Sequence, residues 1–217
     1  SNDDFTNEGI KFSHGKFVTI DGVKVWAQRL SYVGEIGFEL YTNIDESKKL
    51  FLAIIKEGKN HGLSLCGAHA MDIMRMESGF LHWGHDISPE ENQYQAGLKF
   101  AISYKKNINF VGKEALLKIK DQNPTKSLAM MVLKDNRPGE PLLLHEEPIY
   151  LDDKIIGRTT SGNYSFNFKK NISFGYVNSG NSIEDLINKN LSIEVEKKKY
   201  PVTIIKKPLN QKNIKDI

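Results

Sequence analysis

The first part of the chain alternates between apolar and polar positions in two runs separated by an Asp-Gly pair. Residues 17–20 form the first run, Asp21-Gly22 follows, and residues 23–28 alternate again. Asp-Gly between alternating runs is the strongest short-range signal of a β-hairpin, because both residues tolerate the positive φ of a tight turn. The pattern predicts two antiparallel strands, with Trp26 on the face opposite to Val25.

A second turn is predicted between residues 29 and 41, where Gly34 and Gly37 bracket two residues. Paired glycines there indicate a backbone that needs positive φ or closely approaches a neighbour. In the strand that follows, Phe38 and Leu40 share one face, and Glu39 lies on the other with Tyr41. A carboxylate in an apolar strand either reaches water or holds a polar partner, so Glu39 is a solvated edge residue or a ligand-binding one.

Helical periodicity takes over after this strand. A helix is predicted from an Asp45 cap to about Glu57, then a short strand at residues 62–66 and a second helix at residues 68–78 with Asp72 and Arg75 paired. The apolar stripe of the first helix is Leu50, Phe51, Ile54 and Ile55. Strand, strand, helix, strand, helix is an α+β order of the ferredoxin-like kind.

The middle of the chain carries weaker signals. The sequence at Ser88–Glu91 predicts a helix start with a capping box, residues 96–102 a strand, and residues 112–120 a short helix. Asn123-Pro124 breaks the pattern, and we place a domain boundary there, which gives domains at residues 1–123 and 124–217.

From Ser127 onward the pattern of apolar and polar residues predicts short strands separated by turns, with one helical stretch at residues 183–188. The predicted strands are residues 128–133, 148–151, 154–160, 173–177, 191–195 and 201–205. Half a dozen short strands at this spacing predict a small barrel or a sandwich.

Composition narrows the class of protein. The chain has 217 residues, of which 39% are hydrophobic and 26% charged, and no apolar run reaches the ~20 residues that a membrane span needs. The single cysteine, Cys66, excludes an internal disulfide framework and is expected to be a buried, inert thiol. We expect a reducing compartment, either the cytoplasm or, in a eukaryote, the mitochondrial matrix.

Ser1-Asn2 is typical of a protease scar, so the chain is expected to be a piece of a longer protein.

The net charge of +3 conceals an asymmetry between the two halves. Residues 1–100 hold 10 Lys/Arg against 14 Asp/Glu, and the remaining residues hold 20 against 13. A basic second half is compatible with an RNA-binding β domain. The lysines are dispersed, however, and no evident aromatic platform accompanies them, which favours a solvated surface over nucleic acid as a partner.

No strong catalytic motif is present. His82 and His85, followed by Asp86, could ligate a metal, but they sit in a turn and no second ligand pair follows, so no metal is expected. The sequence has no phosphate-binding glycine loop and no local signature of a nucleophilic serine or cysteine.

Several stretches, in order along nearly the whole chain, resemble the aminomethyltransferase (glycine cleavage T-protein) superfamily. They resemble more closely the C-terminal folate-binding region of dimethylglycine and sarcosine dehydrogenases. The stretches are SYVGEIGFELY at 31–41, DIMRMESG at 72–79, HWGHD at 82–86, AGL at 96–98, FVGKEAL at 110–116, TTSGNY at 159–164, GYV at 175–177 and YPVTIIKKPL at 200–209.

The resemblance implies α+β subdomains of the folate-binding fold followed by a small C-terminal β barrel. It implies one-carbon transfer to tetrahydrofolate, giving 5,10-methylenetetrahydrofolate in the dehydrogenase branch. FAD would belong to a separate upstream flavin domain. The family's catalytic aspartate lies in an N-terminal part of the fold that precedes Ser1, so no catalytic residue is assigned here, and the chain is expected to be inactive by itself.

Carried over residue by residue, the resemblance implies that Tyr32 packs on folate and that Glu39 hydrogen-bonds the pterin amino group. A carboxylate suits that edge, since it can accept two N–H donors at once. The family's folate-contacting arginine is replaced by Met71, which favours the dehydrogenase branch. A family glutamate is replaced by Gln95.

Two readings stay open beside one-carbon transfer, namely a non-catalytic folate-binding or regulatory module of the same fold and an RNA-binding β domain. The expected partners are folate and an upstream flavin domain or the N-terminal half of the fold. A chain that lacks such a partner exposes apolar surface, so self-association is a further expectation.

Overall fold

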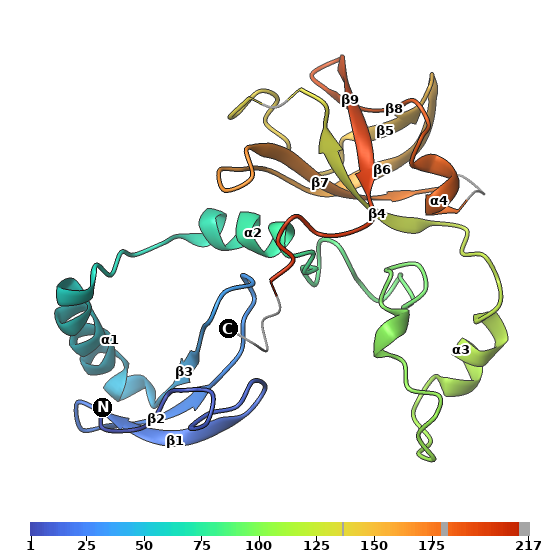
Figure 1. Cartoon of the computed structure of the whole chain (residues 1–217). Coiled ribbons are helices and arrows are strands. Elements are labelled where there is room, and N and C mark those ends of the chain that lie inside the picture. Colours follow the sequence, from blue (N-terminus) through green and yellow to red (C-terminus); the bar gives the residue numbers. More distant parts are fainter. Residues whose placement is uncertain (136, 179–181, 213–217) are drawn as a thin grey trace. The chain divides into compact units, whose positions relative to one another are not determined.

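A computed structural model describes residues 1–135, 137–178 and 182–212. Contacts divide the chain into two compact units, one of Ser1–Arg75 with Asn210–Ile217 and one of Met76–Leu209. Each unit is described by itself below, and its elements are labelled in Figure 1. Among the described residues, no helix is long and apolar enough to cross a membrane.

The first unit is built on a three-stranded antiparallel sheet in the order β1-β2-β3, formed by Gly15–Ile20, Val23–Gln28 and Glu39–Tyr41. Asp21 and Gly22 join the first two strands with φ values of 49° and 75°. Positive φ at both central residues is the geometry that Asp-Gly favours in a two-residue hairpin turn. The predicted hairpin is therefore confirmed.

Helix α1 (Ile44–Gly58) packs on one face of this sheet. Leu50 joins Val18 and Val25 in the buried core of the unit, with Ile54 at its margin. Two details of the predicted helix were wrong. Asn43, and not Asp45, occupies the N-cap position; Asp45 lies in the first turn, where its negative charge interacts favourably with the positive end of the helix dipole. Phe51 does not belong to the buried stripe, since it is 51% exposed.

Residues 62–66, all of them described, form no strand, and Cys66 is exposed, so both of those predictions were wrong. The physical reason is that the segment ends the 3₁₀ turn at Lys59–His61, which follows α1, instead of pairing with a sheet. Gly62 adopts a left-handed φ of 72°, and the Leu63 N–H donates to the Gly58 carbonyl at 2.9 Å. A left-handed glycine followed by an apolar residue that bonds back to the last turn is a common helix end.

Helix α2 (Ala68–Glu77) ends before Gly79, whose φ is 74°, as predicted. Arg75 is buried and bonds the Asp72 carboxylate through two nitrogens, Nε at 2.9 Å and Nη2 at 2.8 Å. The predicted Asp72–Arg75 pair is confirmed.

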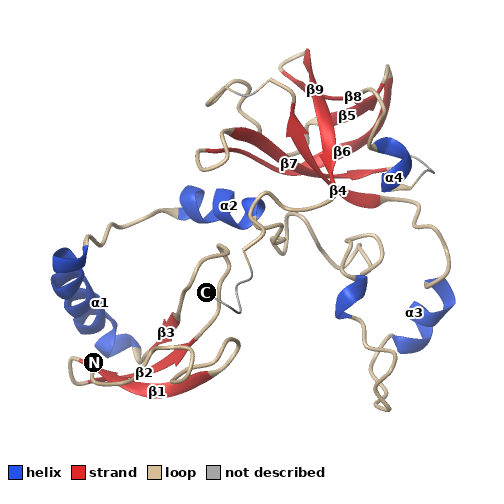
Figure 2. Ribbon diagram, viewed as in Figure 1, coloured by secondary structure: helices blue, strands red, loops and turns tan. Residues whose placement is uncertain are grey.

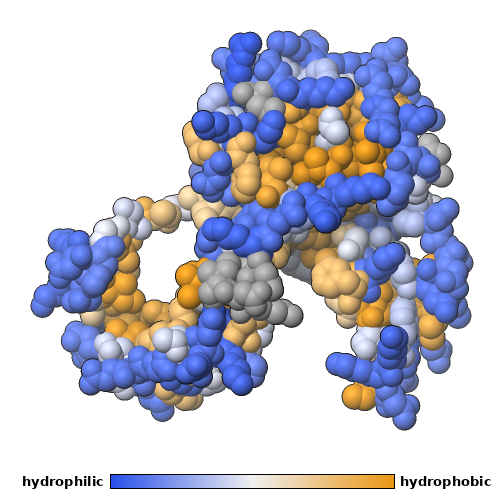
Figure 3. All heavy atoms as spheres, in the orientation of Figure 1, coloured by the Kyte–Doolittle hydropathy of each residue, from blue (hydrophilic) through white to orange (hydrophobic). Residues whose placement is uncertain are grey.

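The second unit contains a closed barrel whose strands follow the order β4-β7-β6-β5-β8-β9 (Figure 2). The strands are β4 Ser127–Leu133, β5 Pro148–Leu151, β6 Lys154–Ser165, β7 Lys170–Val177, β8 Leu191–Val195 and β9 Lys198–Ile205. Six strands were predicted, and the structure decides for a barrel over a sandwich. Met131, Ile149, Ile193 and Leu186 of helix α4 (Ile183–Leu186) fill its interior. Figure 3 shows hydrophobic residues gathered on the face of the barrel turned to the viewer.

Helix α3 (Lys113–Ile119) confirms the helix predicted at residues 112–120, but the two elements predicted before it were wrong. No helix begins at Ser88, although its N–H and hydroxyl both donate to the Glu91 carboxylate. Residues 96–102 form no strand and include a 3₁₀ turn at Lys99–Ala101. The Asn92 side chain accepts from two backbone N–H groups and bends the chain immediately after Glu91, which stops helix growth.

The domain boundary at Asn123-Pro124 stays a prediction, and it differs from the division of contacts after Arg75. Limited proteolysis tests it. We expect the first cuts between residues 118 and 127, because the side chains of Lys120 and Asp121 are 46% and 86% exposed there. First cuts inside residues 1–117 or inside the barrel would contradict the boundary.

Candidate functional site

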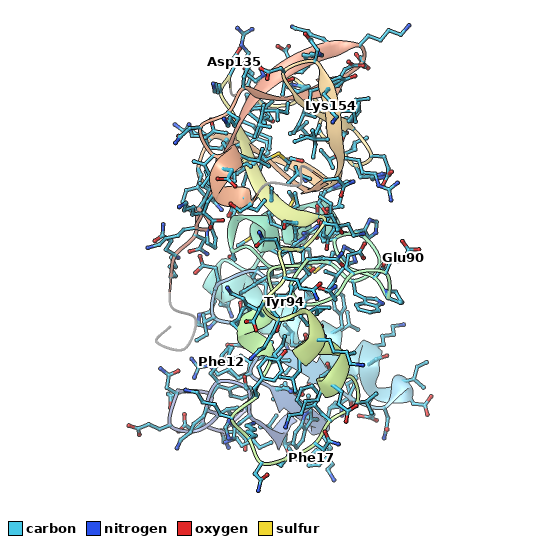
Figure 4. The ribbon with its side chains drawn as sticks, turned by 90° about the vertical axis from the view of Figure 1, so that its right-hand side faces the viewer. Phe12, Phe17, Glu90, Tyr94, Asp135 and Lys154 are labelled. Atoms are coloured by element: carbon cyan, nitrogen blue, oxygen red, sulfur yellow. The ribbon has the colours of Figure 1, made fainter. Side chains whose placement is uncertain are left out.

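The candidate site is the face of the three-stranded sheet that points away from α1. Strand alternation places the buried side chains of β1 and β2 on the α1 side and leaves the other face to larger and more polar groups. The members of this outer face are Gly15, Phe17, Thr19, Lys24, Trp26, Gln28, Glu39 and Tyr41. Phe17 is 61% exposed and is labelled at the lower end of Figure 4.

Trp26 lies at the centre of this outer face. Its ring meets Phe17 edge-on at a centroid distance of 5.1 Å and covers Gly15, where an added Cβ would stand 2.7 Å from the indole. The indole Nε1–H donates to the Gln28 side chain at 3.3 Å. Glycine at position 15 therefore lets the indole lie against the backbone, and the face carries a fixed, flat aromatic surface.

Glu39 begins β3, opposite Gln28 and beside the aromatic surface, and it is exposed as a strand-edge carboxylate. The Tyr41 hydroxyl donates a hydrogen bond to Glu39 Oε2. That bond, together with desolvation and the carboxylate charge, raises the pKa of Tyr41 above its usual value. No residue that the structure describes donates to Oε1, so Glu39 keeps acceptor capacity for a ligand.

The glycine turn before Glu39 has the geometry expected from the sequence. Gly34 has a φ of 74°, and a Cβ on Gly37 would stand 3.1 Å from the Leu30 carbonyl oxygen. Tyr32 lies in this turn and is half-buried. Tyr32, within this tight turn, is thus partly covered, and Glu39, which follows the turn, faces solvent.

The end of the described chain returns to the same turn. The Asn210 amide donates to the Gly34 carbonyl at 3.4 Å, and Lys212 Nζ pairs with Glu35 Oε1 at 2.6 Å. These two residues therefore tie the tail to the turn that carries Tyr32. Nothing in the local sequence signals this contact, because the partners are about 176 positions apart.

Asp86 belongs to the second unit and has a structural role. Its side chain is completely buried and accepts hydrogen bonds from Thr160 Oγ1 at 2.6 Å, Ser161 Oγ at 2.8 Å and the His82 N–H at 2.9 Å. The carboxylate thereby fastens the loop of residues 82–86 to β6. Within the described residues, no group of three His, Cys, Asp or Glu side chains could hold a metal ion.

Two residues that the resemblance singled out, Met71 and Gln95, lie in described parts of the chain. Met71 is 45% exposed on α2. Gln95 is used locally, since its side-chain oxygen accepts from the Asn92 N–H at 3.0 Å.

Sequence reasoning assigned no function to the aromatic surface of Phe17 and Trp26. The signal was present, since the alternation that buries Val18 and Val25 forces the intervening residues onto the opposite face. Together these side chains offer a flat apolar surface beside an exposed carboxylate. Such a face suits a planar ring that carries N–H donors along one edge.

Two family models match the chain, the GCVT N-terminal domain over residues 1–106 and the glycine cleavage T-protein C-terminal barrel domain over residues 126–210. The chain belongs to the glycine cleavage T-protein family. The crystal structure of glycine cleavage system aminomethyltransferase T from Bartonella henselae matches 95% of this chain and 55% of its own, with a TM-score of 0.79 and 21% identity. That likeness confirms the fold, a mixed α/β part with a closed six-stranded barrel.

The curated relatives include aminomethyltransferases and dehydrogenases. Human mitochondrial dimethylglycine dehydrogenase is 32% identical over 96% of this chain, as is 4-methylaminobutanoate oxidase (formaldehyde-forming) of Paenarthrobacter nicotinovorans. The aminomethyltransferase of Symbiobacterium thermophilum is 36% identical over 76% of this chain. The chain spans 23%, 24% and 44% of the length of these three proteins, respectively.

Proposed function

We propose that this chain contributes a tetrahydrofolate site to one-carbon transfer, with Glu39 as the group that recognises the pterin ring. The observation that carries the proposal is the exposed Glu39 carboxylate, which has an oxygen without a described partner and stands beside a flat aromatic surface. A pterin edge presents adjacent N–H donors, and a carboxylate accepts two of them in a charge-assisted pair. Tyr32, in the neighbouring turn, packs against the folate.

The chain's own residues bind and orient the folate and do not make or break bonds. Tetrahydrofolate supplies the amine nitrogens that take up the one-carbon unit. Relatives named as aminomethyltransferases and as dimethylglycine and sarcosine dehydrogenases support this class of reaction. In our proposal the one-carbon unit comes from an N-methyl amine that a separate flavin domain oxidises.

Binding is tested by fluorescence on the natural polypeptide that carries this chain. The sequence has two tryptophans, and Trp83 is 66% exposed in the second unit, so Trp83→Phe leaves Trp26 as the reporter within this chain. We expect saturable quenching by tetrahydrofolate, because a ring stacked on the outer face lies close to the indole.

The matched ligand for this titration is p-aminobenzoylglutamate, which has the folate tail without the pterin. We expect it to quench weakly and to compete poorly. Equal competition by this tail compound, or the absence of saturable quenching by tetrahydrofolate, would contradict pterin recognition at Glu39.

A further inference from the structure

The two oxygens of the Glu39 carboxylate are not equivalent. Oε2 accepts the Tyr41 hydroxyl, whereas no residue in the described part of the chain donates to Oε1. An exposed glutamate that is unrestrained samples several rotamers, and fixing them on ligand binding costs conformational entropy. A residue that already holds one oxygen reduces that cost before any ligand arrives.

The sheet dictates which residue can do this. Glu39 and Tyr41 are two positions apart on β3, so their side chains share the outer face. Cross-strand pairing sets Tyr41 opposite Trp26 and Glu39 opposite Gln28. Trp26 of β2, the residue opposite Tyr41, is itself held in place, because its ring packs over Gly15 and its indole N–H bonds Gln28.

We propose that Tyr41 is a positioning residue, whose hydroxyl holds Oε2 of Glu39 so that Oε1 and the remaining lone pair of Oε2 face the N–H edge of a pterin ring. This inference rests on the proposed function, since it concerns the same site. Tyr41 itself does not contact the ligand edge. The Tyr41 hydroxyl orients the Glu39 carboxylate in the way that residues surrounding a metal site fix the side-chain conformation of the metal's ligands.

Tyr41→Phe tests the role by removing the hydroxyl and keeping the ring. The side chain is 53% exposed, so the variant is expected to fold. We expect the Kd for tetrahydrofolate to rise roughly three- to tenfold, because the variant loses the net contribution of one ordinary hydrogen bond. The matched control is Tyr150→Phe in the barrel, a tyrosine whose pKa is raised by burial and by the nearby Glu194, and it should bind tetrahydrofolate as the parent does.

A second readout separates positioning from simple packing and needs no ligand. With ring-labelled tyrosine, the Tyr41 signal is assigned from its loss in Tyr41→Phe and titrated through alkaline pH. Glu39→Gln should lower the pKa of Tyr41 toward its usual value, because the carboxylate that raises it is gone. An unchanged Tyr41 titration would overturn the hydrogen bond and, with it, the proposal.

The double variant Glu39→Ala, Tyr41→Phe shows whether Tyr41 affects folate binding through Glu39 or by contacting the ligand itself. We expect it to bind no more weakly than Glu39→Ala alone. Fully additive losses would mean that Tyr41 contacts the ligand itself, which overturns positioning. If Glu39→Ala weakens binding and Tyr41→Phe does not, only the positioning role fails. If Glu39→Ala itself leaves binding unchanged, the proposed function fails.

Discussion

Replacing Glu39 with alanine is expected to weaken tetrahydrofolate binding at least tenfold. The substitution removes one or two charge-assisted hydrogen bonds to the pterin edge, each worth about 1.5–3 kcal/mol, and ~1.4 kcal/mol corresponds to a factor of ten in Kd. Tryptophan quenching or calorimetry on the natural polypeptide measures the change. Where that polypeptide carries a flavin domain, its oxidation of the amine should be unaffected, because that reaction does not involve the pterin edge.

The matched control is Glu8→Ala, which removes an exposed glutamate from the same unit and changes the net charge equally. Glu8→Ala should bind folate like the parent, whereas Glu39→Gln should lose affinity because an amide N–H₂ opposes the ring donors. Unchanged affinity in Glu39→Ala would make Glu39 a solvated edge residue.

Asp86→Ala is expected to destabilise the second unit by about 3 kcal/mol or more. The variant leaves the buried hydroxyls of Thr160 and Ser161 and the His82 N–H without their acceptor, and each orphaned donor costs ~1–3 kcal/mol. Urea unfolding followed by fluorescence measures the free energy of unfolding. Trp83, in the loop that Asp86 anchors, reports on the site directly.

Asp153→Ala provides the comparison for Asp86. Asp153 also belongs to the barrel unit and pairs with Lys199 at 3.0 Å, but its side chain is fully exposed. Exposed ion pairs contribute only ~0–1 kcal/mol, so this variant should unfold almost as the parent does. Similar losses in the two variants would refute the anchoring role of Asp86.

The elements that the sequence predicted correctly are those with strong local determinants. Asp21-Gly22 specifies the first hairpin because few other pairs adopt positive φ twice without strain. The strands at Pro148–Leu151 and Leu191–Val195 begin and end where predicted, because turn residues such as Asp152 punctuate apolar runs. Closure into a barrel needed the pairing of β4 with β9, which no local pattern encodes.

The failures arose where a local signal was used for another purpose. The Ser88–Glu91 hydrogen bonds of a capping box are present, yet the Glu91 carboxylate also binds Lys126 at 2.6 Å, so the motif ties a loop to the start of β4 instead of opening a helix. Leu63 was predicted to lie in a strand, but its N–H bonds back to the carbonyl of Gly58, the last residue of α1. Competition of this kind is set by tertiary partners, which a window of neighbouring residues does not contain.

For the candidate site, the sequence placed Glu39 and Tyr41 on the correct face and located the glycine turn. It left unassigned the aromatic neighbours, which strand pairing brings beside Glu39 from two other strands. The roles of Tyr32 and Glu39 in binding stay predictions, and the variants above test the role of Glu39.

The tail contact at Gly34 and Glu35 has a consequence for the order of folding. Residues 76–209 separate the two parts of the first unit, so the contact closes a very long loop. In an unfolded chain, closing a loop of that length costs on the order of 4 kcal/mol from its length alone, whereas an exposed ion pair such as Lys212–Glu35 contributes only ~0–1 kcal/mol. Once the barrel has formed, much of that loop is already compact and the cost falls. The tail should therefore dock late, after the barrel, and the turn that carries Tyr32 should reach its final order in the last step of folding.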